Sequence, residues 1–242
     1  MDPLISLIIP FSGYLIGSVS FTRIIGKLVL PGENLERSTV QVEGTNEYFS
    51  FRSVSATTIR ARAGAKYGMI TSILDLLKAA IPITIALNCL DSQAYAYLLS
   101  ASIILGHDFP VYYRFRGGRG VSCLLGSLIF LDWTSIPITL ALSTGIGLFV
   151  IDDAFIAYLS MPIYLIPWTL LTTGASQFSA YAIAVNAIYW LALIPEIQEY
   201  MNFRRTEAYK KAKKARHERT KKRISKILFK LRIKREDCSH SL

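Results

Sequence analysis

The sequence predicts an all-α, polytopic membrane protein of about seven transmembrane helices, and three observations carry this prediction. Of the 242 residues, 52% are hydrophobic and only 18% are charged, with a mean hydropathy of +0.36. The apolar residues gather in runs close to the roughly 20 residues that a helix needs to cross a bilayer. Basic residues are concentrated in alternate connections between those runs. This composition disfavours a single water-soluble domain.

The first apolar run covers residues 4–30 and contains small residues at helical spacing. Gly13, Gly17 and Ser20 would let another helix approach closely along one face. Arg23 lies near the end of the run, where a charged side chain must either snorkel to the interface or face a polar site. Snorkelling is the expectation for Arg23.

Residues 31–67 form a polar connection that is too long to be a simple turn. Its second half places the hydroxyls of Ser53 and Thr57 near Arg60 and Arg62. Hydroxyls among arginines suit a phosphate ligand, although any solvated loop can carry the same residues. Both interpretations remain open at this point.

The second apolar run, residues 68–90, contains Asp75 and Lys78, three residues apart and hence on one helix face. Each charge costs roughly 2.5 to 3.5 kcal/mol at the centre of a bilayer unless it is paired or faces a polar cavity. The two residues therefore mark the inside of the helix bundle. They are interpreted either as part of a site or as a structural ion pair.

A third run, residues 94–109, leads into the loop around which the chain is organised, residues 106–121. Gly117, Gly118 and Gly120 can take positive φ and expose backbone N–H groups, which makes them candidates for an anion nest. If a helix starts after Gly120, its free N–H groups point at the same place. The loop's charged and polar neighbours are Arg114, Arg116, Arg119 and Ser122. His107 is interpreted as a group that positions the loop or a phosphate, or as a structural histidine.

The remaining apolar stretches are residues 121–131, 136–151, 154–173 and 178–197. The first two are either one kinked span or a short helix followed by a full one. The connections at 91–93, 132–135 and 174–177 hold no Lys or Arg. The second interpretation is preferred because it then places every basic connection and the basic C-terminus on the same side of the membrane. The positive-inside rule assigns that face to the cytoplasm and the N-terminus to the outside.

The chain divides into a predicted membrane domain, residues 1–200, and a basic tail, residues 201–242. The tail holds 16 Lys and Arg against four acidic residues, and accounts for the whole net charge of +10. Ile224, Ile227, Leu228 and Leu231 follow helical spacing among the basic residues, which predicts an amphipathic helix on an anionic leaflet. A solvated charge run is the alternative, and no known nucleic-acid motif supports RNA binding.

Three stretches resemble the PlsY family, the bacterial membrane glycerol-3-phosphate acyltransferases that use an acyl-phosphate donor. Residues 14–21 look like the first-span signature of the family, and residues 56–78 are similar to its Ala-Thr and Asp-x-x-Lys region. Residues 106–121 match its Gly-His-x-Phe-Pro and Phe-Lys-Gly-Gly-Lys-Gly-Val sequence, with Arg116 and Arg119 in place of the lysines. The resemblance covers roughly residues 10 to 200.

The resemblance implies transfer of an acyl group from acyl phosphate to glycerol 3-phosphate, giving lysophosphatidate, at the cytoplasmic face of the cell membrane. Because acyl phosphates are already activated, positioning two anions and stabilising the oxyanion can supply much of the acceleration. No cofactor, metal or nucleic acid is expected; the expected partners are the two substrates, membrane lipids and the enzyme that makes acyl phosphate. The candidate catalytic residues are Lys78, His107 and Arg60; the candidate binding residues are Ser53, Thr57, Arg62, Asp75, Arg116, Gly117, Gly118, Arg119, Gly120 and Ser122.

One departure bears on the chemistry. The family carries an Arg-His-x-x-Asn motif after its last span, where this chain has Pro195-Glu196-Ile197-Gln198-Glu199. If that histidine accepts a proton or orients a group, the activity needs a substitute such as Glu196. A non-catalytic membrane protein that keeps the anion site, or a transferase for another phosphorylated acceptor, is the alternative.

Overall fold

The computed structural model describes residues 2–36, 38–41, 48–51, 54–207, 209–211, 213, 214 and 218. The chain divides into two units. The first comprises Met1–Ser38 and Arg52–Pro195, and the second comprises Thr39–Phe51 and Glu196–Leu242. Ser53 and the tail helix proposed around residues 224–231 lie outside the described residues. The division into residues 1–200 and 201–242 stays a prediction.

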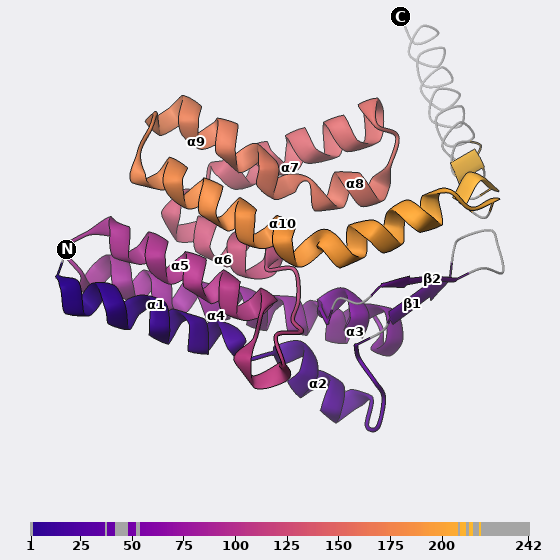
Figure 1. The fold of residues 1–242 in the computed structure, drawn as a ribbon, viewed down its shortest axis with the longest axis horizontal. Coiled ribbons are helices and arrows are strands. Elements are labelled where there is room, and N and C mark those ends of the chain that lie inside the picture. Colours follow the sequence, from indigo (N-terminus) through magenta and orange to yellow (C-terminus); the bar gives the residue numbers. More distant parts are fainter. Residues whose placement is uncertain are drawn as a thin grey trace, which may run out of the picture. The chain divides into compact units, whose positions relative to one another are not determined.

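The all-α class is confirmed, because helices account for nearly all the regular structure of the described residues. The helices are α1 Pro3–Ser18, α2 Phe21–Val29, α3 Ala56–Ala63, α4 Ala65–Cys89, α5 Gln93–Asp108, α6 Val121–Leu131, α7 Ser135–Gly145, α8 Ala154–Leu159, α9 Leu165–Thr173 and α10 Gln177–Arg204 (Figure 1). Three short helical turns join them: η1 Val111–Tyr113, the π-helical η2 Ile146–Val150 and η3 Met161–Tyr164. Two strands, β1 Ser38–Gln41 and β2 Tyr48–Phe51, form a two-stranded sheet.

Several helices have the length and composition of membrane spans. Within the described residues, the stretches Pro3–Val29, Ala65–Cys89 and Gln177–Arg204 are long and apolar enough to cross a bilayer. Two shorter apolar helical stretches, Val121–Leu131 and Ser135–Val150, accompany them. The separation between these two agrees with a break near residue 132, whereas the count of seven spans stays a prediction.

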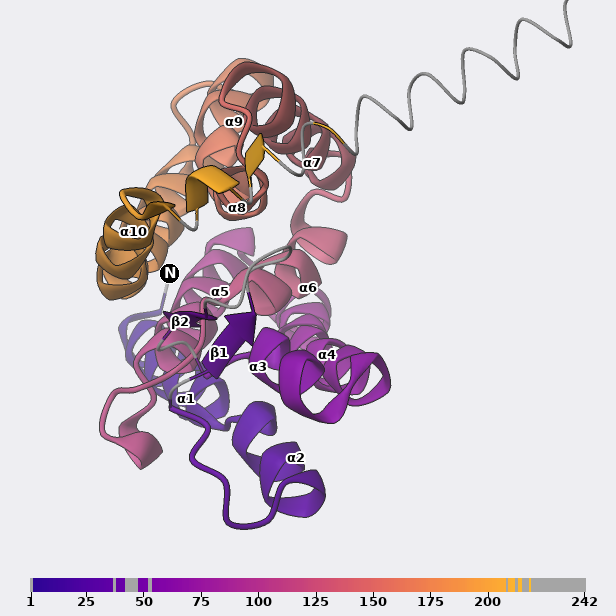
Figure 2. The ribbon, with the colours of Figure 1, turned by 90° about the vertical axis from the view of Figure 1, so that its right-hand side faces the viewer.

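Helix α1 packs along α5 in the first unit, as both views show (Figures 1 and 2). A Cβ added to Gly17 would overlap the backbone carbonyl of Ile103, and one added to Gly13 would lie 3.0 Å from the carbonyl oxygen of Leu99. These glycines therefore bring the two backbones together, which confirms the expected close approach. Ser20 has another role, since its hydroxyl accepts a hydrogen bond from Arg23 N and caps α2.

Helix α4 lies between α5, α6 and α3, and Figure 2 shows α3 beside it. Gly64 has φ +97 and forms the corner between α3 and α4. A Cβ at Gly68 would lie 2.8 Å from Cα of Arg60, so α3 folds closely back on α4. This arrangement packs the last turn of α3 against the first turn of α4.

Three predicted boundaries are wrong. The run 4–30 is not one helix, because α1 ends at Ser18 and α2 starts at Phe21. The run 154–173 breaks into α8, η3 and α9, where Pro162 supplies no backbone N–H at the start of η3. The connection 31–67 contains α3 and the small sheet, and α4 begins at Ala65 rather than at residue 68.

Candidate functional site

The loop at residues 109–120 starts where α5 ends and returns to His107 before α6 begins. Gly118 N–H donates a hydrogen bond to the His107 carbonyl oxygen at 3.1 Å. Gly117 accepts a hydrogen bond at its carbonyl oxygen from Val54 N–H, also at 3.1 Å. The first bond fastens the loop to the end of α5, and the second fastens it to the segment that enters α3.

The backbone conformation of the loop differs from the expected nest. Of the three glycines, Gly120 has positive φ (+64), whereas Gly117 and Gly118 do not. Positive φ falls instead on Arg114 (53°) and Phe115 (59°). The prediction of a nest made by positive φ at all three glycines is therefore wrong.

Gly117 and Gly118 are required for another reason, which is close approach to His107. A Cβ on Gly118 would overlap Nε2 of the His107 ring, and one on Gly117 would overlap the His107 carbonyl oxygen. The loop backbone therefore lies directly on the histidine. A larger residue at either position must displace the loop or the ring.

Lys78 joins the predicted charged residues into one buried cluster. Its Nζ lies 3.3 Å from Asp75 Oδ1 and 3.0 Å from His107 Nδ1. It also donates to the carbonyl oxygens of Gly17 at 3.0 Å and Val19 at 2.8 Å, where α1 ends. The ammonium group thus satisfies unpaired carbonyls at the break between α1 and α2.

This contact also fixes which nitrogen of His107 carries its proton. A lysine ammonium only donates hydrogen bonds, so His107 Nδ1 must accept one from Lys78. The neutral imidazole then carries its proton on Nε2. That atom is the one against which Gly118 packs.

The predicted site residues of α3 have different surroundings. Arg60 is exposed, and its side chain forms no hydrogen bond or ion pair with any described residue. Thr57 is half-buried in the first turn of the helix. Arg62 donates to Glu33 Oε2 at 3.2 Å and to the Asn34 carbonyl oxygen at 2.7 Å. Arg62 is thus committed to the turn after α2.

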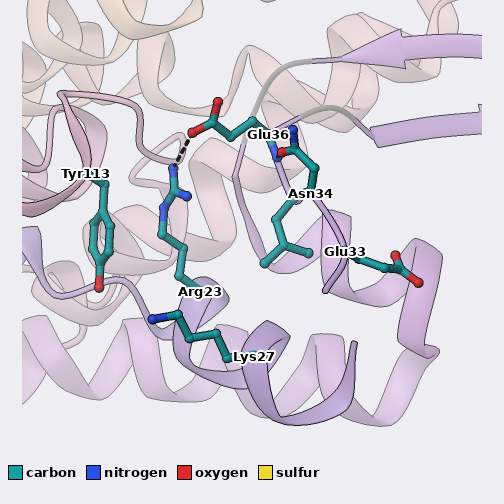
Figure 3. Close-up of a pocket in the computed structure, with 7 residues that line it drawn as sticks. Arg23, Lys27, Glu33, Asn34, Glu36 and Tyr113 are labelled. Atoms are coloured by element: carbon teal, nitrogen blue, oxygen red, sulfur yellow. Dashed lines mark hydrogen bonds and ion pairs between the residues drawn. The ribbon is translucent and has the colours of Figure 1, made fainter. Parts of the chain in front are cut away.

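A pocket of about 400 Å³ opens beside this turn, between α2 and the loop (Figure 3). The sequence prediction did not include it. Two basic residues of α2, Arg23 and Lys27, contribute to its lining, and Tyr113 packs against the Arg23 guanidinium at 4.8 Å from the ring centroid. The other lining residues are Glu33, Asn34, Leu35 and Glu36.

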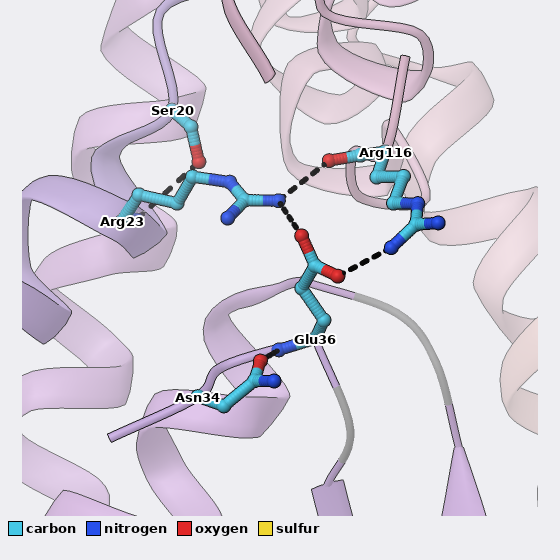
Figure 4. A network of polar contacts seen from close by, with 5 residues as sticks. All are labelled: Ser20, Arg23, Asn34, Glu36 and Arg116. Carbon is cyan, nitrogen blue, oxygen red and sulfur yellow. Dashed lines mark hydrogen bonds and ion pairs between the residues drawn. The ribbon is translucent and has the colours of Figure 1, made fainter. Parts of the chain in front are cut away.

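Glu36 connects α2 to the loop by bridging two arginines (Figure 4). Its Oε2 lies 2.6 Å from Arg116 Nη1, and its Oε1 lies 3.4 Å from Arg23 Nη2. The hydrogen bond from Arg116 lowers the pKa of the Glu36 carboxyl below its ordinary value, against the opposing effect of its partial burial. Arg23 also donates to the Arg116 carbonyl oxygen at 3.0 Å, so it faces a polar site and does not snorkel as expected.

Helix α6 begins directly at the loop, with Gly120 as its N-cap residue and no side-chain cap. Its first N–H groups therefore have no partner within the helix. Ser122 is half-buried in this turn, and the Arg119 guanidinium is buried near the ring of Tyr158 at 5.8 Å from the centroid. The N-terminus of α6 and the Arg119 guanidinium both favour an anion at the loop, whereas the buried Asp108 carboxylate beside Gly120 opposes it.

Two acidic residues at the site were missed. Asp108 is 3% exposed, and neither of its carboxylate oxygens has a hydrogen-bond partner among the described residues. Its Oδ1 lies 3.0 Å from where a Cβ of Gly120 would be. The position of Asp108 directly after His107 was a possible signal. No sequence signal pointed to Glu36, because its partners are 13 and 80 residues away in the sequence. Glu196 is buried in α10 within the second unit, and its role as a substitute stays a prediction.

Comparisons with known sequences agree on one family. Residues 7–205 match the family described as glycerol-3-phosphate acyltransferase. The chain is 31% identical over 203 residues to a "Glycerol-3-phosphate acyltransferase" of Desulfotalea psychrophila, which covers 80% of this chain and 93% of the relative. It is 31% identical over 191 residues to "Glycerol-3-phosphate acyltransferase 1" of Oceanobacillus iheyensis, which covers 73% of this chain and 83% of the relative.

Two crystal structures are similar to the fold. Both are of PlsY (YgiH), described as an integral membrane glycerol 3-phosphate acyltransferase. The glycerol 3-phosphate form has a TM-score of 0.66 at 26% identity, and the lysophosphatidic acid form has a TM-score of 0.63 at 25% identity. In each case the similarity covers 82% of this chain and 93% of the PlsY chain.

Proposed function

The chain belongs to the glycerol-3-phosphate acyltransferase family, and from this premise we propose how it holds the two anions of its reaction. It is a membrane acyltransferase of phospholipid biosynthesis, with glycerol 3-phosphate as the acceptor and lysophosphatidate as the product. The donor is an acyl phosphate whose phosphate group binds at the loop 116–120 and the start of α6. Free backbone N–H groups and the buried Arg119 support this placement.

Lys78 and His107 act in this proposal by positioning the loop. Lys78 holds the His107 ring through Nδ1, and the ring supports Gly118. Asp75 balances the buried ammonium. These contacts favour a structural role in holding the phosphate site, in place of the direct catalytic role expected from the sequence. A pre-organised loop needs little rearrangement when phosphate binds, and this pre-organisation is what stabilises charge in a transition state.

The acceptor phosphate binds at α3, whose last turn carries Arg60, a cation whose side chain has no partner among the described residues. The observation that carries the proposal is the hydrogen bond from Val54 N–H to the Gly117 carbonyl oxygen. It fastens the segment that enters α3 to the donor loop, and this contact is the reason for placing the acceptor site on α3. Two anions held side by side on separate cationic groups suit a transfer between phosphorylated substrates.

The reaction then needs no covalent intermediate with the protein. A glycerol hydroxyl oxygen attacks the acyl carbon, an ester bond forms, and the bond from the acyl carbon to the phosphate oxygen breaks. Inorganic phosphate leaves, and its hydrogen phosphate form balances the proton that the hydroxyl loses. The site faces the cytoplasm at the plasma membrane, because the basic connections share one predicted face.

The identity of the acyl donor is tested by mixing purified protein with labelled glycerol 3-phosphate and either acyl phosphate or an acyl thioester. We expect labelled lysophosphatidate from acyl phosphate alone; product from the thioester alone would contradict the proposed donor.

Arg60→Gln should raise the KM for glycerol 3-phosphate about ten-fold, as expected for one charge-assisted hydrogen bond. Arg62→Gln removes the same charge from a residue paired with Glu33 and serves as the matched control. Equal effects of both variants would contradict the placement of the acceptor.

A further inference from the structure

Helix α2 has three distinct faces, of which one is buried in the core of the unit. Thr22, Ile25 and Gly26 are buried, and Ile25 packs in a small core with Leu35 and Ile59. Ile24 and Leu28 form a second face and are 41% and 77% exposed. Arg23 and Lys27 form the third, which lines the pocket of Figure 3.

The exposed apolar face indicates where this helix lies. With nine residues, α2 is too short to cross a bilayer by itself. Two residues separate it from α1, in a stretch apolar enough to belong to a membrane span. A short helix with one apolar and one basic face lies in the plane of the membrane interface, with its apolar side in the acyl region. Ile24 and Leu28 are the residues that would contact acyl chains.

The pocket beside this helix has more positive than negative charge. Glu33 pairs with Arg62, and Glu36 pairs with Arg116 and more distantly with Arg23. Among the described residues, the Lys27 side chain has no hydrogen bond or ion pair, and the buried Nε of Arg23 has no hydrogen-bond partner. Four cations, Arg23, Lys27, Arg62 and Arg116, therefore lie near the two carboxylates of Glu33 and Glu36. N–H donors of Arg23 and Lys27 remain without an acceptor among the described residues.

We infer that the pocket formed by α2 and residues 33–36 binds the headgroup of an anionic phospholipid of the surrounding leaflet. The phosphate lies against Lys27 and Arg23, and the acyl chains run along Ile24 and Leu28. Cationic and apolar faces side by side on one helix match the two ends of a phospholipid, whereas a soluble anion would use only the first. A volume of about 400 Å³ accommodates a glycerophosphate headgroup. The pocket borders the loop through Tyr113 and the Arg116–Glu36 ion pair, but its ligand does not depend on the identity of the acyl donor.

A photoreactive phosphatidylglycerol analogue tests the inference when the full-length protein is embedded in phosphatidylcholine nanodiscs and the crosslinked peptides are mapped. We expect crosslinks on α2 and residues 33–36 that fall about five-fold in Lys27→Gln, which is the effect of one basic residue near an anionic lipid. Lys66→Gln is the matched control, because Lys66 is an exposed cation outside the pocket. Crosslinks on the basic tail serve as an internal reference.

Three results would overturn the inference. The first is an equal yield on α2 in the wild type and Lys27→Gln. The second is an equal loss in Lys66→Gln, which would indicate general surface attraction. The third is displacement of the lipid from α2 by inorganic phosphate but not by chloride at the same ionic strength, which would indicate a soluble anion as the ligand. The yield on α2 does not depend on turnover, so it is independent of the acyltransferase assay.

Discussion

Lys78 is the residue on which the candidate site depends, because its single ammonium group meets four partners. It pairs with Asp75, donates to His107, and holds two carbonyl oxygens where α1 ends. The side chains of Lys78 and Asp75 are each 3% exposed. Removing one partner of a buried ion pair leaves an uncompensated charge, which typically costs about 3 to 5 kcal/mol.

Lys78→Met should therefore lower the thermal stability of the purified protein in detergent more than Asp75→Asn does. The double variant Lys78→Met/Asp75→Asn should recover part of the loss, because it removes the stranded carboxylate as well. Lys66→Met, on the same helix but exposed, should leave the melting temperature unchanged. Additive effects of the two buried substitutions would contradict the pairing.

The spacing of Asp75 and Lys78 was enough to predict that they share a helix face. The positions of positive φ could not be predicted, because Arg114 and Phe115 take this conformation where the loop turns back toward His107. Glycine at 117 and 118 is explained by contact with His107, ten and eleven positions earlier, which composition cannot reveal. Local sequence therefore indicated the chemistry of the loop but not its geometry.

At the level of elements, the crossing of α1 and α5 depends on backbones that nearly touch. Gly17→Ala would place a Cβ inside the backbone of Ile103, and overpacking of this kind costs roughly 1 to 3 kcal/mol. We expect a lower melting temperature and weaker activity, because α1 also supplies the carbonyls that hold Lys78. Gly145→Ala in α7 is the matched control, since no atom lies within 4 Å of its added Cβ. Equal melting temperatures of the two variants would contradict this account of the crossing.

Hydropathy predicted where helices occur but not where they break. The break between α1 and α2 depends on Lys78, which lies about 60 residues away. The division of 154–173 depends on Ser160 and Pro162, which an average over a long window hides. Helix α3 was missed because its sequence is polar, and its packing on α4 through Gly68 is a tertiary contact.

For the whole molecule, the basic tail and the seven-span orientation remain predictions. The tail should strengthen attraction to anionic membranes without taking part in the chemistry, because every residue of the candidate site precedes it. A deletion of residues 221–242 is preferable to a longer one, since Tyr209 packs against Tyr200 and Phe203. In phosphatidylcholine nanodiscs, the deletion variant should bind phosphatidylglycerol liposomes at least about ten-fold more weakly than the full-length protein does. A stable deletion variant without acyltransferase activity would contradict the division of roles.

The central claim is that the loop holds the donor phosphate with its backbone, seated on His107. The most direct measurement is acyl-phosphate binding and turnover in Gly118→Ala, compared with Gly145→Ala and Arg119→Lys. We predict a loss of about 100-fold or more in Gly118→Ala, which is typical when a backbone anion site is disrupted. Gly145→Ala should be unchanged, and Arg119→Lys should be milder because it keeps the charge while losing the planar fork. Full activity in a folded Gly118→Ala protein would contradict the claim. Equal losses in Gly118→Ala and Arg119→Lys would show that charge geometry, not the backbone, holds the phosphate.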